Sequence, residues 1–135
     1  MADDLIIAAS GNHDGRGAVH VIYGSRTGLT STGDQVWRQS SPGIPGGAEA
    51  NDQFGALIVA ADFGSNPSSQ RYTDLAISSP GESLDGVGSA GTVHVLSGPA
   101  AGLQSRNVQV WREDRLGGRL FDYDSVGFGE LLAGS

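Results

Sequence analysis

The chain of 135 residues contains no cysteine, which excludes disulfide bonds, thiolate metal sites and a cysteine nucleophile. It has only eight Lys and Arg residues against 15 Asp and Glu, for a net charge of −7. Because an acidic surface repels phosphate groups, we expect no nucleic-acid partner. No apolar run approaches the roughly 20 residues that a helix needs to cross a membrane, so we expect no membrane insertion. Residues 1–4 lack the basic start and apolar stretch of a secretory signal. The cellular location therefore cannot be predicted from these residues.

Helical patterns are also missing, whereas glycine is abundant at 22 residues. No segment combines a helical apolar period with capping residues, and each interior glycine would cost a helix about 1 kcal/mol. Short apolar or alternating runs, separated by turn residues, predict strands instead. In the first half of the chain these runs occupy residues 5–9, 18–23, 35–39 and 53–61. The sequence therefore predicts an all-β fold.

The chain contains an internal repeat. Three motifs recur at an offset of 74 residues: Val19-His20-Val21 as Val93-His94-Val95, Gln35-Val36-Trp37-Arg38 as Gln109-Val110-Trp111-Arg112, and Phe54-Gly55 as Phe128-Gly129. Asp4-Leu5 matches Asp74-Leu75 at an offset of 70, so the second copy contains four extra residues before Val93. A period of this length indicates one supersecondary unit per repeat.

Four short strands per repeat fit the blade of a β-propeller, in which blades pack face to face around an axis. A β-sandwich also contains short strands and turns, but it gives no reason for a period of 74 residues. The predicted organisation has three strands of a first blade in residues 1–52 and a complete blade in residues 53–126. Residues 127–135 would then supply a strand that completes a blade of the same chain or of a neighbouring one.

Several motifs follow one another in a characteristic order. Phe54-Gly55 opens a predicted strand, Ala61-Asp62-Phe63 ends it, and residues 72–77 and 78–82 follow. Residues 18–24 with Gly28-Leu29 have a second copy in residues 92–103. Over essentially the whole chain, this order resembles the FG-GAP repeat of integrin α-subunit propellers. The resemblance implies a β-propeller and an extracellular location. It implies no single function, because the family includes adhesion receptors, lectins and accessory domains of secreted enzymes.

FG-GAP repeats carry a calcium loop of the form D-x-D-G-D-G-x-x-D, whose carboxylate oxygens surround the cation. The corresponding segment here runs from Asp62 to Asp74, and Asn66 or Ser65 offers an oxygen between them. The segment is four residues longer than the family loop and has Gly64 in place of a carboxylate. Since calcium affinity follows the number of charged ligands, we expect this loop to bind calcium weakly or to be a solvated hairpin without metal.

A chain with two blades would leave two apolar faces uncovered, because repeat units bury their faces against neighbours. Propellers contain roughly 4 to 8 blades, so closure requires two, three or four copies. We expect a homotrimer, with a homotetramer as the alternative; an excised fragment of a longer propeller would leave the same open faces. The terminal strand would add to a neighbouring sheet. The predicted interface residues are Leu5, Ile6, Ile7, Phe128, Gly129, Leu131 and Leu132.

Catalytic residues are not predicted, because no motif specifies an arrangement of Ser, His and Asp. His20 and His94 occupy equivalent positions between valines, which favours a packing role. Trp37 and Trp111 are also equivalent; a repeated aromatic residue packs between blades, whereas an exposed one can stack on a sugar ring. The sequence thus predicts a non-enzymatic, self-assembling scaffold or protein-binding module. A carbohydrate-binding, lectin-like propeller is the alternative.

Overall fold

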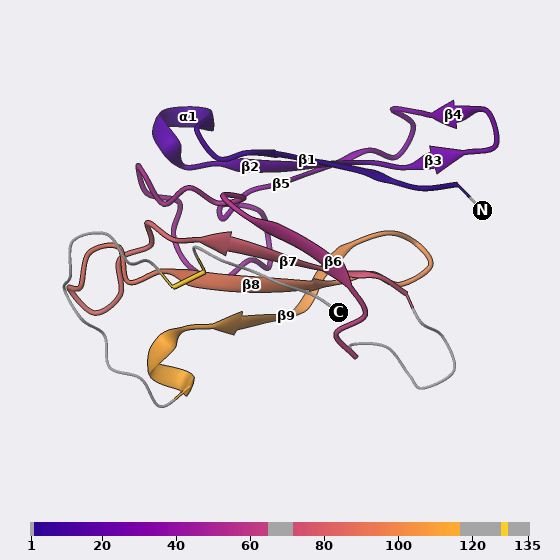
Figure 1. The fold of residues 1–135 in the computed structure, drawn as a ribbon. Helices are drawn as coiled ribbons and strands as arrows, with labels where there is room; N and C mark the ends of the chain where they lie inside the picture. Colours follow the sequence, from indigo (N-terminus) through magenta and orange to yellow (C-terminus); the bar gives the residue numbers. More distant parts are fainter. Residues whose placement is uncertain (1, 65–71, 117–127, 130–135) are drawn as a thin grey trace.

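The protein consists of two stacked antiparallel β-sheets, as seen in a computed structural model that describes residues 2–64, 72–116 and 128–129 (Figure 1). The first sheet, at the top of Figure 1, has the order β1 (Leu5–Ala9), β2 (Ala18–Ile22), β5 (Gln35–Trp37). The second sheet has the order β6 (Ile58–Ala61), β7 (Asp74–Ser79), β8 (Thr92–Ser97), β9 (Gln104–Trp111). Each sheet is therefore built from one continuous part of the chain.

The remaining elements are short. The hairpin of β3 (Gly24–Ser25) and β4 (Gly28–Leu29) lies between β2 and β5 in the chain. The single turn α1 (Asn12–Gly15) contains two residues in the left-handed conformation, and the 3₁₀ turn η1 (Glu113–Leu116) follows β9. Because helix is confined to these two turns within the described residues, the predicted all-β fold is confirmed.

The two sheets repeat the same strand pairing. In the first sheet Val19 lies opposite Trp37, and in the second Val93 lies opposite Trp111. The pairing of β1 with β2 is likewise reproduced by β7 with β8, at the offsets found in the sequence. The sequence repeat is therefore also a structural repeat, in which β1, β2 and β5 correspond to β7, β8 and β9.

The hydrophobic core lies between the two sheets. Val19 and Trp37 point into it from the first sheet, and Leu75, Ile77 and Leu96 from the second. The last three are at most 1% exposed, and each such burial contributes about 1.5–3 kcal/mol. Alternation of side chains along each strand gives every sheet an inner face toward this core and an outer face away from it.

The inner faces of the two sheets are not equivalent in the repeat. The inner residues of the first sheet are counterparts of outer residues of the second: Val19 of Val93, Val21 of Val95 and Trp37 of Trp111. The inner residues of the second sheet are counterparts of outer residues of the first: Leu75 of Leu5, Ile77 of Ile7 and His94 of His20. The sheets therefore stack in one direction, like successive layers, rather than face each other symmetrically.

A backbone crossing at a glycine also occurs twice. Gly17 has a φ of +85°, and a Cβ there would lie 2.1 Å from the carbonyl oxygen of Phe54. Its counterpart Gly91 has a φ of +81°, and a Cβ there would lie 2.3 Å from the carbonyl oxygen of Phe128. Only glycine fits such an approach at positive φ. The two crossings hold Phe54 in the core between the sheets and Phe128 against the outer face of the second sheet.

The strand predicted for residues 53–61 begins later than expected, at Ile58. Phe54 and Gly55 do not open it, because Gly55 has a φ of +90° and its N–H donates a hydrogen bond to the carbonyl oxygen of Ser78 (2.8 Å). These two residues form a turn that carries the chain from the first sheet onto the second. The predicted strand at residues 35–39 is also shorter, since β5 ends at Trp37.

Candidate functional site

Three acidic side chains gather at the junction between the two sheets. Glu49 and Asp52 lie in the connection between β5 and β6, and Glu82 lies in the turn after β7. One carboxylate oxygen of each residue lies within 4.8 Å of the other two. The turn and the connection are in direct contact: the Gly81 N–H donates to the carbonyl oxygen of Asp52 (3.1 Å), and a Cβ at Gly81 would lie 1.8 Å from the carbonyl oxygen of Asn51. Glycine at this position therefore brings the three carboxylates together.

Two of the three carboxylates are buried. Asp52 is 2% exposed and Glu82 is 6% exposed, whereas Glu49 is exposed. Burial raises the pKa of Asp52 to about 6, although its hydrogen bond from the backbone N–H of Glu49 (2.6 Å) opposes the shift. Burial likewise raises the pKa of Glu82 to about 7, and the charges of Asp52 and Glu49 act in the same direction. The cluster therefore resists full ionisation until the pH is near neutral.

Four buried polar atoms near the cluster have no hydrogen-bond partner among the described residues. Gln39, which is 1% exposed, donates a hydrogen bond from Nε2 to the Glu82 carboxylate, but its Oε1 has no partner. The other three atoms are Oγ of Ser79, Oγ1 of Thr92 and Nδ1 of His94. Buried atoms of this kind normally bind water or an ion, because each unsatisfied group costs about 1–3 kcal/mol.

A cavity of about 310 Å³ opens beside the acidic cluster. Glu82, Thr92 and His94 line it from the second sheet, and Pro45 and Gly46 line it from the β5–β6 connection. Nε2 of His94 donates to the carbonyl oxygen of Pro45 (2.8 Å), and burial lowers the pKa of this imidazole. The packing role predicted for His94 agrees with this position. The cavity gives small solutes a path to the buried carboxylate of Glu82.

The predicted calcium loop is described only at its two ends. Asn66 lies outside the described residues, and Asp62 is exposed. Asp74 is fully buried, and its two carboxylate oxygens accept hydrogen bonds from the backbone N–H groups of Phe63 (2.9 Å) and Gly98 (3.0 Å). Asp74, the first residue of β7, therefore fastens the start of the β6–β7 connection at Phe63 and the start of the β8–β9 connection at Gly98.

Asp4 in the first copy plays the same part as Asp74. Its Oδ1 accepts a hydrogen bond from the backbone N–H of Gly24 (2.9 Å), the counterpart of Gly98. A carboxylate that holds the same backbone position in both copies has a structural role in each. This role explains why the Asp-Leu motif recurs in the sequence.

The two tryptophans have the same local geometry in different surroundings. Nε1 of Trp37 donates to Oε1 of Gln35 (3.4 Å), and Nε1 of Trp111 donates to Oε1 of Gln109 (3.3 Å). Trp37 packs against the core between the sheets, whereas Trp111 is 41% exposed on the outer face of the second sheet. Of the two residues predicted to stack on a ligand, Trp111 presents the exposed ring.

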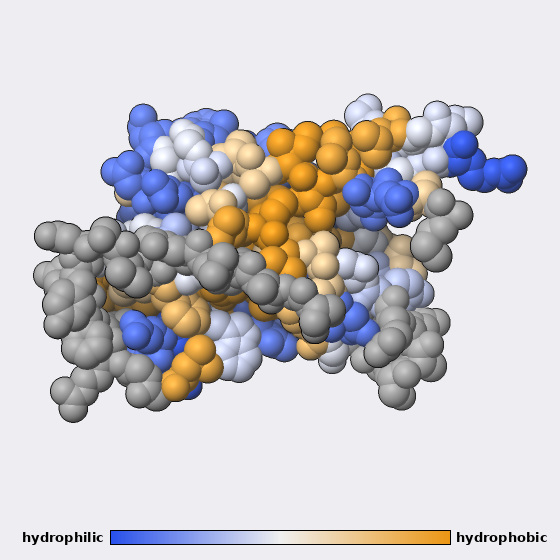
Figure 2. All heavy atoms as spheres, in the orientation of Figure 1, coloured by the Kyte–Doolittle hydropathy of each residue, from blue (hydrophilic) through white to orange (hydrophobic). Residues whose placement is uncertain are grey.

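The first part of the predicted interface lies on β1. Leu5 and Ile7 are 41% and 43% exposed on the outer face of the first sheet, whereas Ile6 points to the inner face and packs against the core. Figure 2 shows hydrophobic side chains gathered over the upper layer, where β1 and β2 lie, and reaching down toward β6. No strand within the described residues pairs with the free edge of β1, although β6 pairs with the corresponding edge of β7.

The second part of the predicted interface lies near the end of the chain. Phe128 is half-buried and packs against Val93 and Val95 on the outer face of the second sheet, and Gly129 follows it in a turn. Leu131 and Leu132 lie outside the described residues.

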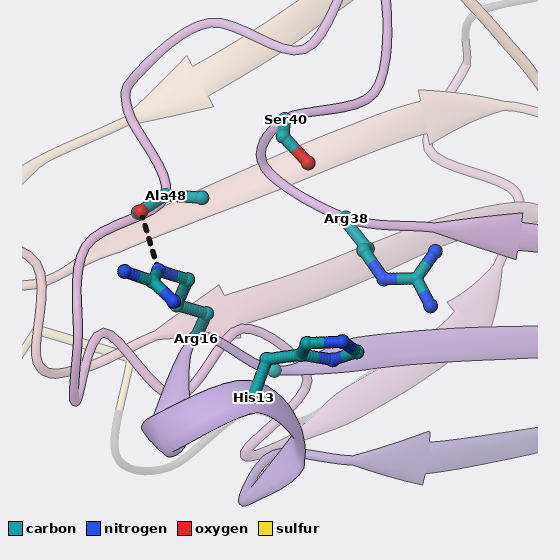
Figure 3. Close-up of a pocket in the computed structure, with 6 residues that line it drawn as sticks. His13, Arg16, Arg38, Ser40 and Ala48 are labelled. Atoms are coloured by element: carbon teal, nitrogen blue, oxygen red, sulfur yellow. Dashed lines mark hydrogen bonds between the residues drawn. The ribbon is translucent and has the colours of Figure 1, made fainter.

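A second hollow, of about 290 Å³, lies beside α1 (Figure 3). Figure 3 shows Arg16 turned toward the β5–β6 connection, where its Nε donates to the carbonyl oxygen of Ala48 (3.1 Å). His13 and Arg38 line the hollow from α1 and from the end of β5. Arg16 thus fastens the β5–β6 connection to the first sheet.

The acidic junction was not predicted from the sequence. Glu49 and Asp52 lie in a connection rich in Pro and Gly, 33 and 30 residues before Glu82, and no metal-binding motif links the three residues. A signal was present in the repeat, where Gln39 corresponds to Glu113 and Glu82 corresponds to Asn12. Polar residues at the same two positions in both copies indicate a polar contact between layers.

No protein-family model matches this chain, and no curated protein matches it. Within the residues that the structure describes, no helix is long and apolar enough to span a bilayer.

Proposed function

We propose that the chain is a non-enzymatic, self-assembling module of the β-propeller type, whose copies stack through their outer faces into a closed ring that serves as a scaffold for protein binding. One observation carries this proposal: the first sheet exposes the positions that the second sheet buries. Leu5 and Ile7 are 41% and 43% exposed, whereas their counterparts Leu75 and Ile77 are 1% and 0% exposed. A neighbouring copy would cover the first pair as the first sheet covers the second pair.

The direction of stacking supports a propeller over a sandwich. In a sandwich of two repeats related by a twofold axis, equivalent residues would meet in the core and the outer faces would be polar. Here non-equivalent faces meet, and the outer face of the first sheet keeps apolar residues. Because this head-to-tail contact joins two unlike faces, every copy keeps one outer face of each kind for a further contact. The addition of copies therefore continues until a ring closes or a filament grows.

The outer face of the second sheet carries the matching residues; Trp111 is 41% exposed there, whereas Val93 and Val95 are 7% and 8% exposed and pack with Phe128. Val93, Val95 and Trp111 on the outer face of the second sheet correspond to Val19, Val21 and Trp37, which pack inward from the first sheet. This face would therefore meet the outer face of the first sheet in the next copy. Trp111 would become buried there, as Trp37 is within the chain.

The polar contact between layers is also complementary across the proposed interface. Within the chain, the Gln39 amide donates to the Glu82 carboxylate. Across the interface, Glu113 of one copy is the counterpart of Gln39, and Asn12 of the next copy is the counterpart of Glu82. An amide would again face a carboxylate, but the amide would come from the other side of the contact. Like charges at this position would weaken the contact, and the sequence avoids them.

Ring size follows from blade number. Two blades per chain and roughly 4 to 8 blades per propeller allow dimers, trimers and tetramers, and we favour the trimer with the tetramer next. The resemblance to FG-GAP repeats supports a propeller, and the free edge of β1 offers a place for strand addition by a neighbour.

Substitution of Ile7 by Asp tests the proposed interface. Because Ile7 is exposed in the single chain, Ile7→Asp leaves the fold intact, but it buries an unpaired charge when copies stack. We expect the mass measured by light scattering to fall to that of one chain, while circular dichroism and the melting temperature stay close to those of the parent.

Phe63→Asp is the matched control. Phe63 has the same exposure as Leu5, 41%, but it lies in the β6–β7 connection and belongs to neither sheet. This variant should assemble as the parent does. An unchanged mass for Ile7→Asp, or equal losses for both variants, would contradict the proposal.

Glycan binding is a second candidate function, favoured by the exposed ring of Trp111. A sugar stacked on Trp111 and a neighbouring copy would compete for the same face. A glycan array probed with the parent and with Trp111→Ala separates the two functions: binding lost with the ring supports the lectin, and no binding supports assembly alone.

A further inference from the structure

We propose that the junction of Glu49, Asp52, Glu82 and Gln39 is a site for a hard divalent cation, Ca²⁺ in particular, that clamps the two sheets of one chain together. This site is distinct from the predicted loop between Asp62 and Asp74. It lies within a single chain, so it does not depend on the proposed assembly.

The donor set suits calcium. Calcium takes 6–8 oxygen ligands at about 2.3–2.6 Å from carboxylates, carbonyls and water. Carboxylate oxygens of Glu49, Asp52 and Glu82 already lie within 4.8 Å of one another, which is the spread of ligands around a single ion. The exposed Glu49 and the adjoining cavity leave room for water as the remaining ligands.

Buried oxygens without hydrogen-bond partners are the independent sign that a ligand belongs here. The side chain of Gln39 is buried, its amide group contacts Glu82, and its Oε1 has no hydrogen-bond partner among the described residues. Oγ1 of Thr92, a residue that is 3% exposed and lines the same cavity as Glu82, also has no hydrogen-bond partner among the described residues. A hydrated cation in this cavity would bind the carboxylates, and its water would satisfy the orphaned oxygens.

The charge balance points the same way. Three carboxylates meet at the junction, and the guanidinium of Arg16 is the cation that acts on Asp52. Arg16 is already bonded to the carbonyl oxygen of Ala48. Arg112 and Arg115 line the adjoining cavity, but Arg112 is paired with Asp85 and Asp114, and within the described residues no ion pair involves Asp52 or Glu82. Two buried carboxylates without an ion-pair partner are costly to ionise, and a divalent ion removes that cost.

The proposal fixes the number of ions per chain. At the equivalent place between copies, Asn12 and Glu113 replace Glu82 and Gln39, and Val126 stands at the position of Asp52. The carboxylates needed for a second site are therefore missing there. One Ca²⁺ per chain is expected, whatever the oligomeric state.

Calorimetric titration of the full chain with CaCl₂ at pH 7.5 tests the site. We expect one ion per chain and a melting temperature that rises by roughly 5 °C or more at saturating calcium, because a ligand bound only to the folded state stabilises it. Glu82→Gln keeps the size of the side chain and removes one charged ligand, so it should lower calcium affinity at least about tenfold and abolish the thermal shift.

Asp62→Asn is the matched control, since it removes a carboxylate from the loop predicted by family resemblance. This variant should bind calcium as the parent does. The proposal is overturned if the parent shows no heat of binding at millimolar calcium, if Glu82→Gln binds as tightly as the parent, or if Asp62→Asn loses the ion. The mass of the particle, measured in the same samples, reports on assembly separately.

Discussion

Individual carboxylates in this chain have opposite roles according to their partners. Asp74 and Asp4 accept hydrogen bonds from backbone N–H groups and so hold the backbone where the strands end. Glu82 is buried beside two other acids, and its one identified donor is the amide of Gln39. The first two residues therefore hold the fold, whereas Glu82 destabilises it unless a proton or a cation is bound.

The pH dependence of stability should reveal this cost at Glu82. Its pKa is raised from 4.5 to about 7 by burial, so the folded chain binds the proton more tightly than the unfolded chain does. Stability present below about pH 4.5 is then lost progressively as the pH rises toward 7. Asp52, whose pKa is raised from 3.8 to about 6, acts in the same direction.

Urea unfolding in the presence of a chelator, at several pH values from 4 to 8, measures the effect. Relative to Glu82→Gln, which has no proton to lose, the parent should become steadily less stable between about pH 4.5 and 7. Parallel curves for the two proteins would show that Glu82 ionises freely in the folded state.

At the scale of structural elements, Gly17 and Gly91 allow two backbone segments to pass in close contact, at Phe54 and at Phe128 respectively. Gly17 and Gly33 both have positive φ, +85° and +78°, but only Gly17 lies against another segment. We expect Gly33→Ala to cost about 1–2 kcal/mol, the conformational penalty alone. Gly17→Ala also drives a Cβ into the backbone of Phe54, so it should cost roughly 3 kcal/mol or more.

Chemical denaturation of both variants gives the comparison. The difference between them isolates the steric term, because their backbone conformations match. Equal losses of stability would mean that the crossing at Phe54 adjusts without cost.

Most strands could be predicted because their sequence motifs occur in both copies of the repeat. The repeated Val-His-Val and Gln-Val-Trp-Arg motifs located β2, β8 and their partners, and the structure gives both copies the same register. The start of β6 was missed because an apolar pattern does not reveal that Gly55 turns the backbone at a φ of +90°. The acidic junction was missed because its residues meet only when the two sheets stack.

At the scale of the whole molecule, the two sheets have two unlike outer faces, of which the first exposes Leu5 and Ile7 and the second exposes Trp111. Each outer face consists of counterparts of residues that are buried between the two sheets of the same chain. The contact between the sheets therefore shows how the outer faces of two copies would pack. A contact that repeats the internal one adds two layers per copy. We therefore propose that the chain assembles with itself into a closed ring.

The most direct test is the mass of the parent protein in solution, measured by light scattering during size-exclusion chromatography over a range of concentrations. A closed ring predicts one constant mass, three times the 13.8 kDa of the single chain, or four times for the tetramer. A stable particle of 13.8 kDa at every concentration would contradict the account.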